Sequence, residues 1–459
     1  MIPFSNLPKT YQEAVIFTRK LNIQYLWIDS LCIIQDDEED WQKESAKMAN
    51  IYQNSYITIA ATGSAGPSEG LFSKHPKTSI SGVFRDGTEY QVHARPVISH
   101  MDEAEFPLLK RGWVYQERLL APRVLHFGRQ ELWWECLEMV QCECSGIVIG
   151  ERYATGQEKF LTKLTHQAAL SHSELPFVSR RWHAIVEEFS QLGLTKSRDK
   201  LPALSGIAQQ ISHMREGIYC AGLWTDTIVT DLLWYRLDPS TAEHTSKWRC
   251  PTFSWAGHDG PVRYFDAPHV PDLPSLCIMN DTIKTLIMNY LEVTEATSRP
   301  VSNNAFGEIL SAHLLLKGLL APIRVVDARS LSDSSTSTKA LSRRIFRRRR
   351  RGQAKSNFEF QFDEGDEGAP LRYSFFADFD LHSADAEFAR EKYVLLRTAQ
   401  DEYGNEYALV LKCIELSQGI CERVGLFTPK FSSWRSADHA DLYNLSFAKA
   451  GEPRELKLV

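Results

Sequence analysis

The spacing of hydrophobic and polar residues in the first part of the chain predicts alternating helices and strands. Apolar residues recur at helical spacing over Tyr11–Leu21, with Thr10 as the expected N-cap. The short apolar segment Tyr25–Asp29 ("YLWID") predicts a buried strand, and a second helical stripe runs over Asp40–Asn54. The β-rich segment Tyr56–Thr62 ("YITIAAT") follows. This order of elements is typical of a parallel α/β sheet flanked by helices.

The rest of the chain mixes helical and strand-like patterns. Arg111–Leu120 has helical spacing, Arg123–Phe127 has a strand-like pattern, and residues 151–215 are mainly helical in pattern. Near the C-terminus, Tyr393–Thr398 and Tyr407–Ile414 flank the turn-like "DEYGNE" and predict a β-hairpin. We therefore expect an α/β N-terminal domain followed by a mixed α+β, β-rich C-terminal region.

Length and local composition divide the chain further. A chain of 459 residues is longer than one hydrophobic core usually serves, so two or three domains are expected. Residues 327–370 combine a Ser/Thr tract, an arginine run and acidic residues, which indicates a disordered basic and acidic insertion. The predicted division is an α/β domain at 1–118, a mixed α+β extension at 119–326, the insertion at 327–370 and a β-rich part at 371–459.

The overall composition excludes several classes of protein. The net charge of -6 argues against a nucleic-acid binder, and no apolar run is long enough to span a bilayer, so we expect neither nucleic acid nor a membrane as partner. Nine cysteines without regular spacing, and no N-terminal secretory signal, indicate a cytoplasmic protein with reduced thiols. The arginine-rich segment Arg343–Arg351 favours nuclear import as an alternative.

The sequence also lacks several motifs that identify common enzyme classes. It contains no GxxxxGK[ST] phosphate loop, no GxGxxG after a predicted strand, no HExxH and no GxSxG. These absences argue against a P-loop NTPase, a Rossmann dehydrogenase, a zincin and an ordinary serine α/β-hydrolase.

Polar residues gather where the first predicted strand ends. Asp29 ends the strand, and Gln35, Trp41 and Glu44 follow in the turn and the next helix. Glu44 lies three residues after Trp41, so its carboxylate borders the apolar stripe. Open α/β sheets usually bind ligands at the carboxyl ends of their strands, so these residues are candidates for a binding or catalytic site. Alternatively, Glu44 pairs with Lys43, Lys47 or a loop arginine, or reaches solvent, and Asp29 bonds to the following backbone amides in an Asx turn.

A second group of candidate residues lies in the helical segment after residue 110. Trp113, Gln116 and Glu117 share one helical face, and Arg111 precedes them. A buried ion pair from Arg111 or Arg118 to an acidic strand-end residue would hold this helix against the sheet. A structural role is therefore favoured over a catalytic one for this group.

Three cysteines raise the question of a metal site. Cys136, Cys142 and Cys144 are spaced C-x5-C-x-C, which is not a usual zinc-binding pattern. His126, ten residues upstream of Cys136, is the nearest histidine that could serve as a fourth ligand. From the sequence we expect no metal.

Several segments together resemble the fungal heterokaryon-incompatibility (HET) domain family, with the domain proper expected at residues 1–118. They are Leu7–Thr62, Arg111–Cys136, Arg198–Ile211 with Tyr219–Trp224, and Cys250–Val262. Members of that family usually begin with a strand resembling "YxxLSYxWG" upstream of the first helix, and this chain starts almost at that helix. We therefore expect an N-terminally truncated domain that lacks its first strand.

The resemblance implies a role in self/non-self recognition and regulated cell death, as an effector or an assembly module. The implied partners are other HET-domain or allorecognition proteins. The family is thought to be distantly similar to TIR domains, some of which cleave NAD through a glutamate on a helix. By that likeness, Glu44 in "DWQKE" would be the catalytic carboxylate, Asp29, Gln35 and Trp41 would bind the substrate NAD, and no cofactor is needed. The third interpretation is an inactive copy of the domain or a cluster-associated protein with another role.

Overall fold

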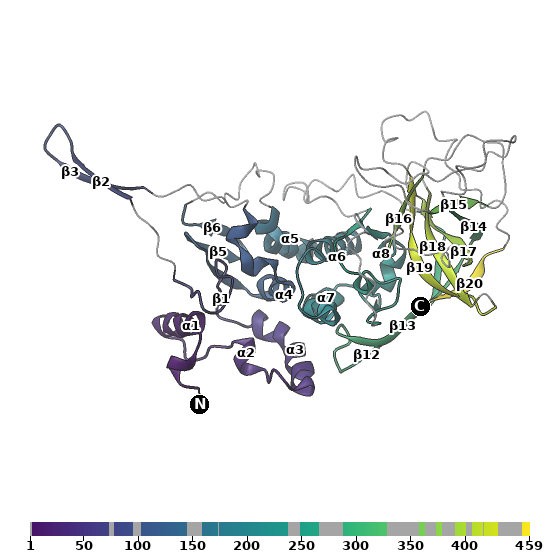
Figure 1. The fold of residues 1–459 in the computed structure, drawn as a ribbon, viewed down its shortest axis with the longest axis horizontal. Helices are drawn as coiled ribbons and strands as arrows, with labels where there is room; N and C mark the ends of the chain where they lie inside the picture. The colour runs from purple at the N-terminus through teal and green to yellow at the C-terminus, as the bar shows by residue number, and fades with distance from the viewer. Residues whose placement is uncertain are drawn as a thin grey trace.

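The computed structural model shows an elongated chain with its N-terminal part at one end and a large β-sheet at the other (Figure 1). It describes residues 2–72, 78–94, 102–144, 158–172, 174–236, 248–265, 288–327, 358–362, 373–378, 391–400, 406–415, 417–429 and 452–459. The predicted import segment Arg343–Arg351 lies outside these residues, and so does most of the predicted insertion.

The N-terminal part contains a four-stranded sheet with helices packed around it (Figure 1). Its strands are β1 (Thr58–Ala60), β4 (Arg123–Phe127), β5 (Leu132–Cys136) and β6 (Val140–Cys142), in the order β1-β4-β5-β6. β1 runs parallel to β4, whereas β4, β5 and β6 pair antiparallel. The prediction of helices with a sheet is confirmed here, but the sheet is mixed, and only its first strand pair is parallel.

One of the helices described in this part begins with a side-chain cap on its first backbone amides. The helices are α1 (Lys9–Lys20), α2 (Asp29–Cys32), α3 (Glu38–Gln53) and α4 (Gly112–Leu120). Asp37 is the N-cap of α3, and its side chain accepts hydrogen bonds from the amides of Glu39 and Asp40. Thr10 is not an N-cap, because α1 follows Pro8, and the Thr10 hydroxyl instead accepts a hydrogen bond from the Gly70 amide.

The prediction of a strand at Tyr25–Asp29 is wrong. Residues 23–28 have no regular secondary structure, and Asp29 begins the short helix α2. A strand exists only when a neighbouring strand pairs with its backbone. Among the described residues, the backbone amides of Tyr25, Leu26 and Trp27 have no hydrogen-bond partner. The segment therefore has strand-like residues but no strand beside it.

A hairpin and several short helices complete the N-terminal part. β2 (Thr78–Val83) and β3 (Glu89–Ala94) form an exposed antiparallel hairpin that projects from the body of the molecule (Figure 1). The 3-10 helices are η1 (Phe4–Asn6), η2 (Glu103–Glu105) and η3 (Pro107–Lys110).

The middle of the chain is mainly helical, as predicted for residues 151–215. Its helices are α5 (Glu158–His172), α6 (Leu175–Phe189), α7 (Ser205–Ser212) and α8 (Ile228–Asp231), with η4 (Ser197–Lys200), η5 (Pro202–Leu204), η6 (Thr225–Thr227) and η8 (Trp255–Gly257). Its strands pair in twos: β7 (Tyr219–Cys220) with β8 (Leu223–Trp224), and β9 (Trp234–Arg236) with β10 (Val262–Tyr264). Each pair forms a small two-stranded sheet, with β10 packed against α6 and β8 against α8.

The C-terminal part is a ten-stranded sheet, which confirms the predicted β-rich region. Its strands are β11 (Met288–Asn289), β12 (Glu292–Pro300), β13 (Ile309–Gly318), β14 (Leu320–Asp327), β15 (Phe358–Phe362), β16 (Tyr373–Ala377), β17 (Tyr393–Gln400), β18 (Glu406–Glu415), β19 (Ile420–Pro429) and β20 (Arg454–Leu458). Eight of them follow the order β12-β13-β20-β19-β18-β17-β14-β15, while β11 pairs with β17 and β16 with β19. The antiparallel pairing of β17 with β18 confirms the predicted hairpin. β15 falls within the predicted insertion.

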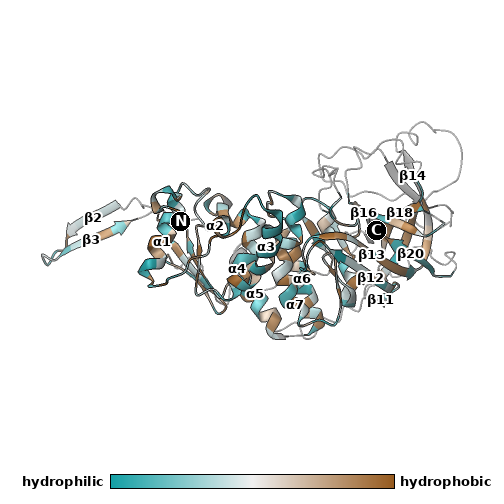
Figure 2. Cartoon of the chain, turned by 90° about the horizontal axis from the view of Figure 1, so that it is seen from below, coloured by the Kyte–Doolittle hydropathy of each residue, from teal (hydrophilic) through white to brown (hydrophobic). Residues whose placement is uncertain are grey.

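One hydrophobic core runs through the middle of the molecule. It includes Ala49 of α3, Leu119 of α4, Trp182 of α6 and Leu458 of β20, each less than a tenth exposed. Figure 2 shows hydrophobic residues along strands of the C-terminal sheet. The core contains residues from both sides of the predicted boundary at 118/119, which falls inside α4, and the domain division stays a prediction. No helix in the described part of the chain has the length and apolar character needed to cross a bilayer.

Candidate functional site

A groove of about 910 Å³ opens beside the edge of the N-terminal sheet. Its volume falls within the range of ligand sites, roughly 300–1,000 Å³. The groove is lined by residues of α1, the Tyr25–Asp29 segment, the end of α3, β1 and the first turns of α4. Among them are Ala14, Leu26, Trp27, Ile51, Ile57, Ile59, Ala61, Leu71, Leu108 and Val114. Most of the lining is therefore apolar.

Two stretches of backbone in the groove wall have a side that is not paired with another strand. β1 pairs with β4 along one edge, and within the described residues no strand pairs with its other edge. The Tyr25–Trp27 amides likewise have no partner among the described residues. An unpaired edge with a free row of amides and carbonyls is a template for another strand.

One end of the groove is polar and contains two predicted candidates, Asp29 and Glu117. Glu117 lies on α4, and its Oε2 accepts a hydrogen bond of 2.9 Å from the Tyr52 hydroxyl of α3. Burial is the main cause that raises the pKa of Glu117 and the nearby Asp29 carboxylate is a smaller one, while the Tyr52 hydrogen bond and Arg111 lower it, so that the resulting pKa is about 7. The same burial and the Glu117 charge raise the pKa of Tyr52 well above its usual value. Glu117 is therefore a carboxyl group that titrates near neutral pH.

A buried ion pair lies behind this polar end and holds α4 against the sheet. Arg118 makes two hydrogen bonds to Glu135 of β5, of 2.7 and 2.8 Å. Burial lowers the pKa of His126 to about 4, so the neutral ring donates from Nε2 to Glu135 and accepts at Nδ1 from the Thr62 hydroxyl. Despite its burial, Glu135 has a pKa below the usual range because Arg118 and His126 stabilise the carboxylate. An arginine of this helix does pin it to the sheet, as predicted, but its partner is Glu135.

The structure places three of the predicted strand-end residues outside the groove. Glu44 forms an ion pair of 2.6 Å with Lys47 on the same helix, and it does not line the groove. Trp41 packs edge-on against Trp113. Gln35 is exposed, and its amide donates to the Ile33 carbonyl. Of the four residues expected at this site, only Asp29 reaches the groove, and the catalytic role of Glu44 stays a prediction.

The second predicted group divides between the groove and the core. Arg111 and Glu117 line the groove. Trp113 donates from its indole nitrogen to Asp199, and Gln116 is fully buried and accepts a hydrogen bond of 2.6 Å from the Gly206 amide. The last two side chains therefore attach α4 to the helical middle of the chain.

A separate cluster brings together two of the three predicted cysteines. Cys142 Sγ and Cys144 Sγ lie 3.3 Å apart, and Cys144 Sγ lies 3.3 Å from Glu131 Oε1. Cys136 is not part of this cluster. None of its residues lines the groove.

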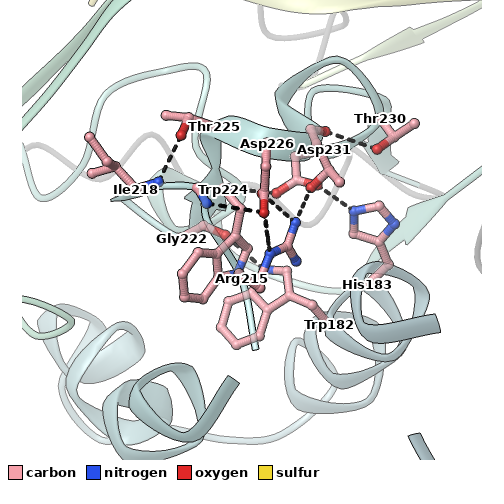
Figure 3. A network of polar contacts seen from close by, with 12 residues as sticks. Trp182, His183, Arg215, Ile218, Gly222, Trp224, Thr225, Asp226, Thr230 and Asp231 are labelled. Atoms are coloured by element: carbon pink, nitrogen blue, oxygen red, sulfur yellow. Dashed lines mark hydrogen bonds and ion pairs between the residues drawn. The ribbon is translucent and has the colours of Figure 1, made fainter. Parts of the chain in front are cut away.

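A further polar network lies in the helical middle of the chain and is shown in Figure 3. His183 of α6 bonds to Asp231 of α8 over 2.8 Å, and Asp231 also accepts a hydrogen bond from the Trp224 amide. Arg215 forms an ion pair of 2.6 Å with Asp226. His183 and Asp231 are fully buried, so this network joins helices and does not form an open site.

Sequence reasoning missed Tyr52, Glu131 and Glu135. Tyr52 lies in the apolar stripe predicted over Asp40–Asn54, and its hydroxyl needs a partner when its ring is buried. Trp133 and Glu135 alternate along β5 and Glu131 directly precedes this strand at the same spacing, so the three share one face, and all three are buried. This alternation, visible in the sequence, indicates that the carboxylates of Glu131 and Glu135 lie on the buried face together with Trp133.

Comparison with known proteins identifies the N-terminal part. Residues 2–117 match the family model described as "Heterokaryon incompatibility protein (HET)", which confirms the expected family for this segment. The match covers most of the residues that line the groove, from α1 to most of α4, whereas Val124 and His126 of β4 lie beyond it. Neither a curated protein nor a solved structure matches the chain.

Proposed function

We propose that this chain, whose residues 2–117 form a HET domain, acts in fungal self/non-self recognition and regulated cell death as an assembly module. Its working surface is the groove beside β1, and its ligand is an extended apolar segment of a partner protein, such as another HET-domain or allorecognition protein. The observation that carries the proposal is the apolar groove bounded by two stretches of unpaired backbone.

The backbone in the groove wall favours an extended ligand over a helical one. A helix satisfies its own amides and carbonyls, so it would leave the edge of β1 and the Tyr25–Trp27 amides without partners. A strand would supply those hydrogen bonds, and its alternating side chains would enter the apolar lining. Main-chain hydrogen bonds would give affinity, and the fit of these side chains to the apolar lining would give specificity.

Filling the groove with a bulky side chain tests this proposal directly. Ala61 lines the groove and Ala46 is exposed on α3 outside it, so Ala61→Trp and Ala46→Trp form a matched pair. We expect cell death on overexpression, and association of the purified chain with its partner, to be lost in Ala61→Trp and kept in Ala46→Trp. Circular dichroism checks that both variants fold. A folded Ala61→Trp variant that still kills and still associates would exclude strand docking in the groove.

NAD cleavage is the second candidate function, and the polar end of the groove favours it. Glu117 titrates near neutral pH close to Asp29, as expected of a carboxyl group that exchanges protons in catalysis. The TIR-like version of this proposal uses Glu44, which lies outside the groove.

The amount of NAD in yeast cells that express the chain distinguishes a catalytic Glu117 from a catalytic Glu44. Loss of NAD consumption in Glu117→Gln with retention in Glu44→Gln places the chemistry in the groove, and the reverse places it at Glu44. Unchanged NAD during cell death removes this candidate.

A further inference from the structure

We propose that Glu131, Cys142 and Cys144 form a binding site for a thiophilic divalent metal ion, of which Zn²⁺ is the natural choice. The site is separate from the groove, and its test does not depend on the function proposed for the groove. The three residues offer two sulfur ligands and one oxygen ligand, and these atoms all lie within 4.8 Å of one another.

The distances between the ligand atoms are close to those around a tetrahedral zinc ion. Zn–S bonds of about 2.3 Å and Zn–O bonds of about 2.1 Å place two sulfurs roughly 3.8 Å apart, and a sulfur and an oxygen roughly 3.6 Å apart. The Cys142 and Cys144 sulfurs are 3.3 Å apart, and Cys144 Sγ is 3.3 Å from Glu131 Oε1. The ligands therefore need to move apart by only about half an ångström to admit the metal.

The register of the sheet explains why these residues meet. β5 and β6 are antiparallel with Trp133 opposite Cys142, and the amide of Glu143 bonds to the carbonyl of Leu132 beyond the last strand pair. Glu131 therefore faces Cys144 in the turn after β6, and Cys144 Sγ contacts both Cys142 Sγ and Glu131 Oε1. The Cys144 amide also donates a 2.9 Å hydrogen bond to Glu131 Oε2, which orients the carboxylate with Oε1 toward the sulfur.

The surroundings favour a bound cation. Glu131 is 4% exposed and Cys142 is 3% exposed, and Phe106, Trp133 and Leu164 pack around this corner of the sheet. A divalent ion bound here would neutralise most of the charge of the Glu131 carboxylate and of the two thiolates. Cys144 is half-buried, so solvent reaches the site from one side.

The ligand set selects the metal. Thiolates bind Zn²⁺ and other soft ions in preference to Mg²⁺ and Ca²⁺, and a carboxylate oxygen is an ordinary zinc ligand. On binding, the two thiols lose their protons to solvent, and the three protein ligands leave the fourth tetrahedral position to water. His126 does not supply the fourth ligand, because its ring nitrogens are bonded to Thr62 and Glu135.

Metal content and thiol reactivity test the site. The full chain is purified under reducing conditions, dialysed, and analysed by inductively coupled plasma mass spectrometry after exposure to Zn²⁺. We expect one zinc ion per chain in the wild type and in Cys136→Ser, and at least a tenfold loss of affinity in Cys142→Ser and Cys144→Ser. Glu131→Gln should weaken binding less, because both sulfurs remain.

A second measurement uses only the wild-type chain, so it does not depend on whether the variants fold. The chain is alkylated with iodoacetamide with and without Zn²⁺, and the modified peptides are identified by mass spectrometry. We expect zinc to protect Cys142 and Cys144 and to leave the exposed Cys32 reactive. Equal alkylation of Cys144 with and without zinc would overturn the proposal, as would zinc retained unchanged by the Cys142→Ser/Cys144→Ser double variant.

Discussion

The Tyr52 hydroxyl donates a hydrogen bond of 2.9 Å to Glu117 Oε2 and thereby links α3 to α4 at the polar end of the groove. The two residues are 65 positions apart in the chain. Their contact places a carboxyl group with a pKa of about 7 in the groove wall, next to Asp29 and Arg111. The titration of Glu117 therefore has consequences for stability as well as for ligand binding.

We predict that the chain loses stability as the pH rises through neutrality, and that Glu117 causes part of this loss. The pKa of Glu117 is raised from 4.5 to about 7, so between these values the folded state binds more protons than the unfolded state. The contribution of Glu117 to the free energy of unfolding is complete below pH 4.5 and is lost as the pH rises through 7. The shift corresponds to a change on the order of 3 kcal/mol in the free energy of unfolding.

Denaturant unfolding between pH 5 and pH 8 measures this effect. The wild type should lose stability over this range, and Glu117→Gln should flatten the curve because glutamine does not titrate. Glu44→Gln is the control, since Glu44 lies on α3 outside the groove. A wild-type curve with the same slope as Glu117→Gln would show that Glu117 titrates at an ordinary pKa.

The Arg118–Glu135 pair predicts strong coupling between two substitutions. Both side chains are largely or fully buried, and the pair has two hydrogen bonds. Removing one partner of such a pair leaves an uncompensated charge and costs about 3–5 kcal/mol. We therefore expect Arg118→Met to be strongly destabilising and the Arg118→Met/Glu135→Leu double variant to recover part of the loss. Thermal unfolding of the two single variants and the double variant measures the coupling energy, and simple additivity would contradict it.

Gly222 occupies a position that only glycine tolerates. Its φ angle is +93°, and a Cβ atom there would lie 2.7 Å from Trp255 Nε1. Its carbonyl also accepts hydrogen bonds of 3.0 Å from the indoles of Trp182 and Trp255. We expect Gly222→Ala to destabilise the chain by about 2 kcal/mol or more, because strain and a steric clash add. Gly66→Ala is the control, since a Cβ there meets no atom within 4 Å, and its melting temperature should stay within a few degrees of the wild type.

The sequence predicted those elements whose pattern is local. The helices α3 and α4 and the hairpin of β17 and β18 follow from apolar spacing within ten to twenty residues, and the structure contains all of them. The strand expected at Tyr25–Asp29 failed, because apolar composition does not show that another strand lies beside a segment, and without that neighbour Tyr25 is 86% exposed.

The candidate site was predictable only in part for the same reason. The sequence places Asp29 at the end of an expected strand and Glu117 on one helical face with Trp113 and Gln116, and the structure brings Asp29 and Glu117 to the groove. The hydrogen bond from Tyr52 to Glu117 and the contact of Glu131 with Cys144 depend on helix packing and strand register. Residue spacing alone does not determine either of these.

The last prediction concerns Arg423, which joins the C-terminal sheet to the helical middle of the chain. Arg423 of β19 is fully buried and bonds to Asp378, while Nη1 and Nη2 donate to the carbonyls of Leu232 and Trp234. Lysine keeps the charge but has a single nitrogen, which cannot reach all of these acceptors at once. Arg423→Lys should therefore destabilise the chain by about 2–4 kcal/mol, because buried acceptors lose their donors.

The matched control for this substitution is Arg454→Lys on β20, where the arginine side chain is exposed. The expected change there is less than about 0.5 kcal/mol, because surface substitutions remove little. Thermal unfolding followed by tryptophan fluorescence is a suitable measurement, since Trp234 packs directly under the Arg423 guanidinium at 3.6 Å. Equal stability of the two lysine variants would mean that the Arg423 contacts do not hold the sheet to the rest of the chain. A selective loss in Arg423→Lys would show that they do.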